Sequence, residues 1–227
     1  MKLTTRLTVM IALAALGMLL LGSVSLLNLR SGLLAERHAQ IENLLKMSAN
    51  LLEVLEGEVK AGKLSQADAQ KRAAEVLAGL RNENNFLFAR NSDNVFVAHV
   101  NPARLGKQDL GAKLPDGRHV VQVYRDELAR QGRFAYVTIP TAKPGAATGE
   151  LSDKLNGVTV FEPWGWTLGT GFFTDDINRA FTHYALWMAL LAALVLGGTV
   201  GFAVYSSRRI TRQLGGDPAE AAHAVHT

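Results

Sequence analysis

Two long runs of apolar residues stand out along the chain. Residues 7–29 and 184–207 contain no Asp, Glu, Lys or Arg. Each run is long enough, at about 20 residues or more, to cross the hydrocarbon core of a membrane as a helix. The first is too long for the apolar core of a cleaved signal peptide, which has about 7 to 15 residues. A buried helix of a soluble protein rarely runs so far without a polar face. The pattern therefore predicts two transmembrane helices.

Basic residues flank both runs and predict their orientation. Lys2 and Arg6 precede the first run, and a cluster of arginines follows the second. Lys and Arg are enriched on the cytoplasmic side of membrane spans. We therefore expect residues 1–6 and 208–227 in the cytoplasm and residues 30–183 outside the inner membrane. The outer segment is long enough for one domain with its own core.

Residues 86–100 predict a β-hairpin. Two short runs of β-branched and aromatic residues flank an Asn-Ser-Asp-Asn cluster, which is typical of a turn. Side chains alternate between the two faces of a strand. His99 is therefore expected to share its face with Val95 and Val97, and Phe96 is expected on the opposite face. This places His99 among apolar neighbours.

The segment after the first apolar run predicts a long helix. Its most regular stripe, with steps of four and three residues, consists of Ile41, Leu45, Ser48, Leu52, Leu55 and Val59. The stripe allows two interpretations: it pairs with the same helix of a second subunit, or it packs against the chain's own sheet. We expect the homodimer, because the stripe extends a membrane helix that is itself free to associate.

Two shorter helices are expected farther along the chain. Ser65 followed by Asp68 forms a capping-box pattern, which predicts the start of a helix. The buried side of that helix is expected to consist of Ala73, Val76, Leu77 and Leu80. Residues 119–131 predict a third helix, and Gly132 stands where a cap with positive φ is common.

Three further strands complete the pattern. Alternating residues predict strands at 133–140, 154–161 and 166–173. A Glu-Pro-Trp-Gly turn at 162–165 joins the last two strands. Residues 141–153 are expected to form a long polar loop, and loops of that length are commonly functional or mobile. Together with the hairpin, this makes five strands.

Several segments resemble the single Cache domain of bacterial chemoreceptors. They are VAHVNPARLGK at 97–107, KPG at 143–145 and EPWGWTLGTGFFTDDI at 162–177. The resemblance covers residues 30–179. After the second apolar run, SSRRITRQLGGDPAEAA at 206–222 resembles the start of a HAMP segment in the same receptors.

The resemblance implies an α+β fold with a PAS-like, five-stranded antiparallel sheet behind a long N-terminal helix. It also implies a periplasmic domain, often dimeric, that binds small organic acids in a pocket on the sheet. Signals would pass through the second span and HAMP to a cytoplasmic output module. The chain ends at Thr227, too soon for two HAMP helices. We therefore expect part of a longer receptor, or an anchored sensor that acts through a partner.

A carboxylate that enters an apolar cleft needs hydrogen-bond donors or cations to replace its water. The candidate ligand-binding residues are Phe88, His99, Tyr136, Lys143 and Lys154. The alternative for His99 is a core histidine with its polar atoms satisfied, and for either lysine a solvated surface position. Arg104 and Lys107 are expected to hold their loop or to face water.

Other classes of function lack their signatures. The sequence has no nucleophile elbow, HExxH motif, Walker loop or cysteine. Asp175 and Asp176 are expected to cap a helix rather than to catalyse. His223 and His226 are only two potential ligands, which do not make a metal site. No basic stripe interleaved with aromatic residues indicates nucleic-acid binding. We expect no catalysis, cofactor, metal or nucleic-acid partner.

Three hypotheses remain from the sequence. The first is a chemotaxis receptor module that binds a small organic anion and transmits the signal through its second span. The second keeps the same domain as the input of a sensor histidine kinase or diguanylate cyclase. The third is a membrane-anchored exterior enzyme or scaffold without signalling.

Overall fold

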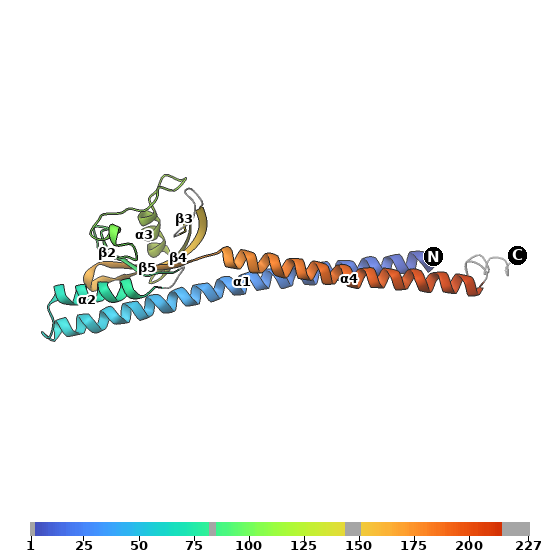
Figure 1. Ribbon diagram of the computed structural model, residues 1–227, viewed down its shortest axis with the longest axis horizontal. Coiled ribbons are helices and arrows are strands. Elements are labelled where there is room, and N and C mark those ends of the chain that lie inside the picture. The colour runs from blue at the N-terminus through green and yellow to red at the C-terminus, as the bar shows by residue number, and fades with distance from the viewer. Residues whose placement is uncertain (1–2, 82–84, 144–150, 215–227) are drawn as a thin grey trace. The chain divides into compact units, whose positions relative to one another are not determined.

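The computed structural model describes residues 3–81, 85–143 and 151–214 (Figure 1). The chain divides into two compact units. The sheet domain is Leu33–Ile177, and the helical unit combines Met1–Gly32 with Asn178–Thr227. Residues 215–222 of the HAMP-like segment, together with His223 and His226, lie outside the described residues, as do Pro144 and Gly145 of the KPG sequence.

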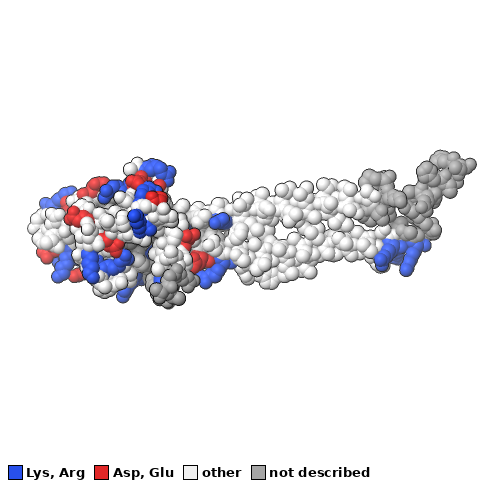
Figure 2. Space-filling view, turned by 90° about the horizontal axis from the view of Figure 1, so that it is seen from above, with Lys and Arg blue, Asp and Glu red and all other residues white. Residues whose placement is uncertain are grey.

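The helical unit contains the two apolar runs. They belong to α1 (Leu3–Lys60) and α4 (Asp175–Leu214), and both helices are long and apolar enough to cross a membrane. Within this unit the helices approach each other closely, because a Cβ added at Gly22 would lie 3.3 Å from Cε of Met188. Figure 2 shows that no charged side chain covers their apolar stretch, and that basic residues gather at its end.

The sheet domain is built on a five-stranded antiparallel sheet with the order β2-β1-β5-β4-β3. The strands are β1 (Phe88–Arg90), β2 (Phe96–Ala98), β3 (Ala135–Ala142), β4 (Leu151–Phe161) and β5 (Trp166–Phe173). The expected hairpin is therefore β1 and β2. A 3₁₀ turn, η2 (Glu162–Trp164), joins β4 to β5 and ends at Gly165 with φ of 61°. The predicted α+β fold is confirmed.

Strands β3 and β4 both reach farther toward the segment that connects them than their sequence patterns predict: β3 ends at Ala142 and β4 begins at Leu151. Their pairing continues to Ala142 opposite Leu151, with Pro140 opposite Asp153. The expectation of a polar loop over residues 141–153 is therefore wrong at both ends. Backbone hydrogen bonds between β3 and β4 hold these end residues in the sheet, although their side chains do not show the alternation of polar and apolar residues from which a strand is predicted.

One face of the sheet packs against α1. Ile41, Leu45 and Leu52 of the apolar stripe are fully buried there. The helix approaches closely because a Cβ added at Gly157 of β4 would overlap Cγ2 of Ile41. The expectation that this stripe pairs with a second subunit is wrong, since its residues already pack on the chain's own sheet.

Helix α2 (Gln66–Gly79) packs beside α1 on the same face. As predicted, Ser65 caps it, because its hydroxyl accepts a hydrogen bond from the Asp68 amide at 3.1 Å. The buried side is narrower than expected and consists of Ala69, Ala73 and Leu77. Val76 and Leu80 are each 45% exposed, which corrects their assignment to the core.

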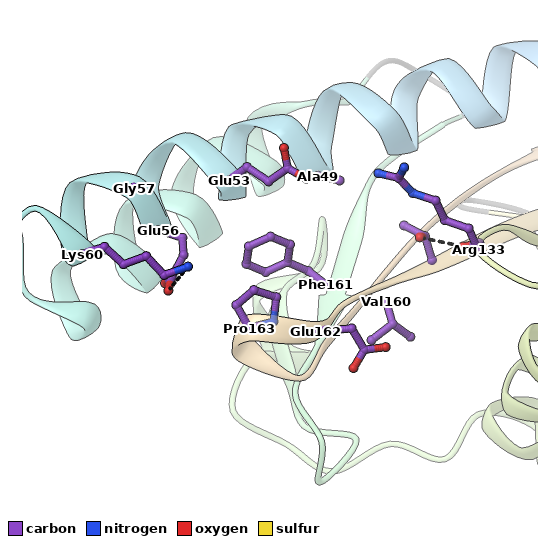
Figure 3. A pocket seen from close by; sticks show the side chains of 11 residues that line it. Ala49, Glu53, Glu56, Gly57, Lys60, Arg133, Val160, Phe161, Glu162 and Pro163 are labelled. Atoms are coloured by element: carbon purple, nitrogen blue, oxygen red, sulfur yellow. Dashed lines mark hydrogen bonds and ion pairs between the residues drawn. The ribbon is translucent and has the colours of Figure 1, made fainter.

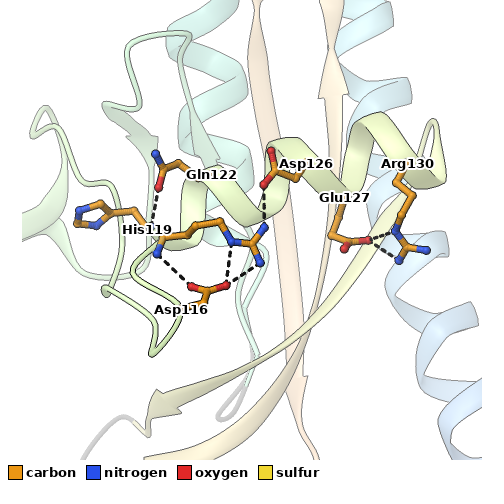
Figure 4. A network of polar contacts seen from close by, with 7 residues as sticks. Asp116, His119, Gln122, Asp126, Glu127 and Arg130 are labelled. Carbon is orange, nitrogen blue, oxygen red and sulfur yellow. Dashed lines mark hydrogen bonds and ion pairs between the residues drawn. The ribbon is translucent and has the colours of Figure 1, made fainter.

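The opposite face is covered by α3 (Val120–Gln131) and by the loop that follows β2. This loop begins with the 3₁₀ turn η1 (Pro102–Arg104). It is tied to α3 through Arg118, whose guanidinium donates to Asp116 and Asp126 (Figure 4). In the same network the amide of His119 donates to the Gln122 side chain at 2.8 Å. These contacts fix the layer that closes the candidate site.

Candidate functional site

A cavity of about 380 Å³ lies between the sheet and the layer of α3 and the β2–α3 loop. Aromatic side chains of β1 and β2 form much of its apolar wall, and the polar wall consists of Arg90, His99, Arg104, Tyr124, Thr141, Lys154 and Asn156. No Asp or Glu is among its lining residues. The cavity therefore combines an apolar body with an excess of positive charge.

Strand register explains how these side chains reach one face. Phe88 lies opposite Gly169, and Lys154 lies opposite Phe173. Because residues two apart along a strand share a face, Arg90 joins Phe88 and Asn156 joins Lys154. Gly169 has no side chain at this point, and a Cβ there would overlap the Phe88 ring. The glycine thus makes room for the aromatic wall rather than for a ligand.

Arg90 is the most unusual group in the cavity. Its side chain is buried with 6% exposure, and its Nε and Nη1 have no hydrogen-bond partner within the described chain. Nη2 lies 4.0 Å from Oδ1 of Asp109, and the guanidinium stacks over the Phe96 ring at 4.2 Å from its centroid. Burial lowers the pKa of Arg90 below its ordinary value. Buried donors without a partner are rare because they lower the stability of the folded state. The guanidinium of Arg90 can therefore donate to an acceptor on a ligand.

Lys154 is buried to a similar degree, with 4% exposure. Its Nζ lies 4.3 Å from the centroid of the Phe86 ring and 5.3 Å from that of Phe173. Among the described residues it has no carboxylate partner. Burial lowers the pKa of Lys154 to about 8, so the ammonium still carries its charge at neutral pH. An anion in the cavity would compensate for its lost hydration.

His99 lies on the opposite face from the one that strand alternation predicts. Its ring packs against Phe96 with 4.6 Å between ring centroids, and both residues line the cavity. The reason is that β2 ends at Ala98, and the Asn101 amide donates to Nδ1 of His99 at 2.9 Å, which turns the chain. The expectation that His99 shares the face of Val95 and Val97 is wrong.

The protonation of His99 follows from its contacts. Burial and the charge of Arg104 lower its pKa to about 4, so the ring is neutral at pH 7. Nδ1 accepts the Asn101 amide, which leaves the proton on Nε2. Nε2 lies 3.4 Å from Nη1 of Arg104, which is also a donor. Both nitrogens are therefore donors, and among the described residues they share no acceptor.

Arg104 is held in place by Asp109. Its Nε and Nη2 lie 3.1 and 2.5 Å from Oδ2 of that carboxylate. Burial alone would raise the pKa of Asp109, but the Gly111 amide and Arg104 together hold it below its ordinary value. Arg104 holds its loop, as expected from the sequence, and it also lines the cavity.

The family described as Single Cache domain 2 matches residues 33–187. The chain belongs to this family. The methyl-accepting chemotaxis protein McpP of Pseudomonas putida is 28% identical over 205 residues, which cover 86% of this chain and 37% of McpP. The sensor histidine kinase MctS of Rhizobium johnstonii is 27% identical over 147 residues, 64% of this chain and 30% of MctS. The chain thus spans about a third of the length of these relatives.

Solved Cache structures share this fold. A Cache chemosensory domain whose structure was described as a basis for carboxylic acid recognition is 27% identical with a TM-score of 0.55, and the match covers 63% of this chain and 97% of that one. A methyl-accepting chemotaxis protein of Vibrio parahaemolyticus, 23% identical with a TM-score of 0.54, covers 67% of this chain and 99% of that one, and shows the fold alone.

Two of the five candidate residues lie outside the cavity of the Cache domain. Tyr136 lies on the α1 side of the sheet, where its hydroxyl donates to Oε2 of Glu42 at 3.0 Å. Lys143 forms an ion pair with Asp175. The structure thus brings together Phe88, His99 and Lys154 of the predicted set.

Sequence reasoning missed the role of two arginines. Arg90 has a signal in the sequence, because a charged residue two positions after Phe88 in an otherwise apolar strand must share a buried face. Arg104 has no such signal, since the residues around it are typical of a turn and do not indicate a binding role. Only the packing of that loop over the sheet brings it to the cavity.

Another cavity, of about 390 Å³, lies between α1 and the β4–η2 region of the Cache domain (Figure 3). Glu53, Glu56 and Glu162 line it, opposed by Lys60 and Arg133. Glu56 is already engaged, because it accepts the Trp164 indole N–H at 2.7 Å and lies 3.4 Å from Lys60. The carboxylates that line this cavity disfavour a small anion. The cavity on the opposite face of the sheet is therefore the stronger candidate for a carboxylate site.

Proposed function

We propose that this chain is the sensor module of a transmembrane chemoreceptor, and that its Cache domain binds a short-chain carboxylate in the cavity on the α3 side of the sheet. The observation that carries the proposal is Arg90, which is buried with two donor nitrogens that have no partner among the described residues. Lys154 and the paired donors of His99 and Arg104 add three more groups that a carboxylate can accept from. Charge-assisted hydrogen bonds of this kind are strong and directional.

The dimensions and walls of the cavity support a small ligand. A volume of about 380 Å³ lies at the lower end of the range for small-molecule sites, which is about 300 to 1,000 Å³. The rings of Phe86, Phe88 and Phe96 offer apolar contact for a short hydrocarbon tail. A structural relative that recognises carboxylic acids, at 27% identity, supports the same ligand class.

The connection to the membrane supports a signalling role. Strand β5 ends at Phe173 and α4 begins at Asp175, so Thr174 alone separates a strand of the binding sheet from a candidate membrane helix. Thr174 is itself held by β4, because its amide and hydroxyl both donate to the Asp153 carbonyl. A rearrangement of the sheet on ligand binding would therefore reach α4 directly.

A second candidate function is the input domain of a sensor histidine kinase. The match to MctS favours it, because it covers 64% of this chain at an identity similar to that of McpP. Both functions use the same ligand cavity and the same membrane helices. They differ in the output module, so the sequence downstream of the HAMP-like segment distinguishes them.

The proposal is tested with the full chain purified in detergent. We expect sodium acetate, propionate, pyruvate or lactate to raise the melting temperature relative to sodium chloride at equal ionic strength. Ligand at about 100 times its Kd would stabilise the native state by about 2.7 kcal/mol. Arg90→Met should abolish the shift, whereas Arg72→Met, at an exposed position on α2, should retain it. If no acid of the panel stabilises the chain, the proposal fails.

A further inference from the structure

The proposed ligand cavity, called the first cavity, has a neighbouring cavity of about 250 Å³, called the second cavity. Arg90 and Tyr124 line both cavities and therefore form the wall between them. The other polar residues of the second cavity are Asn91, Ser92, Asn94, Arg125 and Thr167. Its lining contains two arginines and no carboxylate, so its charge matches that of the first cavity.

The geometry of Arg90 indicates two acceptors rather than one. A guanidinium is planar, and a single carboxylate binds two nitrogens that share an edge. Nε and Nη1 do not share an edge; each shares one with Nη2, the nitrogen that faces Asp109. Both Nε and Nη1 are buried without a partner within the described chain. One carboxylate therefore satisfies at most one of them, and the other still needs an acceptor.

Tyr124 keeps the two spaces apart. Its side chain is 7% exposed and stacks on Phe88, with 6.4 Å between ring centroids and 21° between ring planes. In the second cavity, Thr167 of β5 lies directly opposite Arg90 in the strand register. Arg125 follows Tyr124 on α3, and it has no ion-pair partner among the described residues.

We propose that the second cavity is a second anion site, which takes a small carboxylate bound by Arg90 and Arg125. The first cavity takes another carboxylate, bound by Arg90 together with His99 and Lys154. The two sites share one guanidinium and use it from different edges. The ligand class rests on the proposed function, whereas the existence of the second site rests on the unpaired edges of Arg90 and the separate cavity.

Counting bound ligand tests the second site. Equilibrium dialysis of the detergent-solubilised full chain against radiolabelled propionate should give two propionates per chain at saturation. Thr167→Phe places a ring in the second cavity only and should leave one propionate. Thr167→Val, which preserves side-chain volume, should keep two. Lys154→Met acts on the first cavity only and should also leave one.

A second variant guards against misfolding of Thr167→Phe. Arg125→Gln removes an exposed charge and should raise the Kd of the second site about threefold. Arg130→Gln, on the same helix but outside both cavities, should leave both affinities unchanged. One propionate per chain, lost in Lys154→Met but unaffected by Thr167→Phe and Arg125→Gln, would overturn the second site and leave the proposed function standing. No bound propionate at all would overturn both.

Discussion

At the scale of single residues, the Cache domain has two cations, Arg90 and Lys154, at buried positions where apolar side chains are more common. Arg90 and Lys154 are each more than nine-tenths buried and have unpaired donors or no carboxylate partner in the described chain. Replacing a buried charge with a well-packed apolar residue is often neutral or stabilising. Groups that are unfavourable for folding alone are common at binding sites, where the ligand completes them.

The pH dependence of binding should report on Lys154. Because burial lowers its pKa to about 8, the ammonium loses its proton as pH rises through 8, and carboxylate affinity should fall over the same range. We expect the Kd for acetate or propionate, titrated between pH 6.5 and 9.5, to rise above pH 8 in the wild-type chain. In Lys154→Met this rise should disappear.

The stability of the empty chain should change in the opposite direction. Between pH 8 and the ordinary lysine pKa of 10.5, the unfolded chain binds more protons than the folded one at this residue. The contribution of Lys154 to the free energy of unfolding therefore increases with pH across this window, and the penalty for its burial is fully present below pH 8. Identical pH profiles for wild type and Lys154→Met would contradict this assignment.

At the scale of elements, close approach of α1 to β4 decides how the sheet domain packs. The approach depends on Gly157, which faces the fully buried Ile41. The helix carries the largest part of the core on that face, so its distance from the sheet affects many contacts at once. Interiors are packed densely enough that one added methyl group is felt.

Gly157→Ala should therefore destabilise the domain by about 1 to 3 kcal/mol, because the added Cβ overlaps the Ile41 side chain. A matched control is Gly57→Ala in α1, where an added Cβ meets nothing within 4 Å. In that helix interior the change should stabilise by about 0.5 to 1 kcal/mol. Denaturant unfolding of both variants measures the difference. Equal stability of the two variants would show that the α1–sheet contact yields without strain.

At the scale of the whole molecule, membrane topology determines which side the ligand comes from. Two helices of the chain are long and apolar enough to span, and arginines follow the second. From the positive-inside rule we expect those arginines in the cytoplasm. With two spans, we propose that the sheet domain faces the periplasm, where it would meet ligands from outside the cell.

Cysteine labelling tests this topology, because the chain has no cysteine of its own. Ser92→Cys, at an exposed turn of the sheet domain, should react with a membrane-impermeant maleimide in spheroplasts. Thr5→Cys, near the N-terminus, should react only after the membrane is permeabilised. The reverse pattern would place the sheet domain in the cytoplasm and remove the basis for an extracellular ligand.

A homodimer, which we propose as the receptor's assembly, needs a surface other than the buried stripe. Met47 and Val54 lie seven residues apart on α1 and are 68% and 63% exposed. Met47→Cys should form an interchain disulfide in membranes under mild oxidation. Leu45→Cys, at a fully buried position, should not. Cross-linking at neither position, or only at Leu45, would argue against a dimer through this face.

The sequence by itself determined the elements and the family of this protein. Apolar run length, strand alternation and the capping pattern at Ser65 act over a few residues, so the chain alone specifies them. In the strand predicted at 133–140, alternation places Phe134 and Tyr136 on one face and Ala135 on the other, and the structure shows the same division. Phe88, His99 and Lys154 are candidates from the sequence because the family resemblance implies a pocket on the sheet and a carboxylate there needs donors.

Only the tertiary structure decided which face of the sheet holds the cavity. Alternation assigns residues to two faces but does not say that α1 covers the face of Tyr136 and α3 the other. It also fails where a strand ends, as at His99, whose ring turns with the chain at Asn101. Arg104 reaches the cavity through a loop that folds back over the sheet. These placements depend on contacts between residues far apart in the chain, which no local pattern contains.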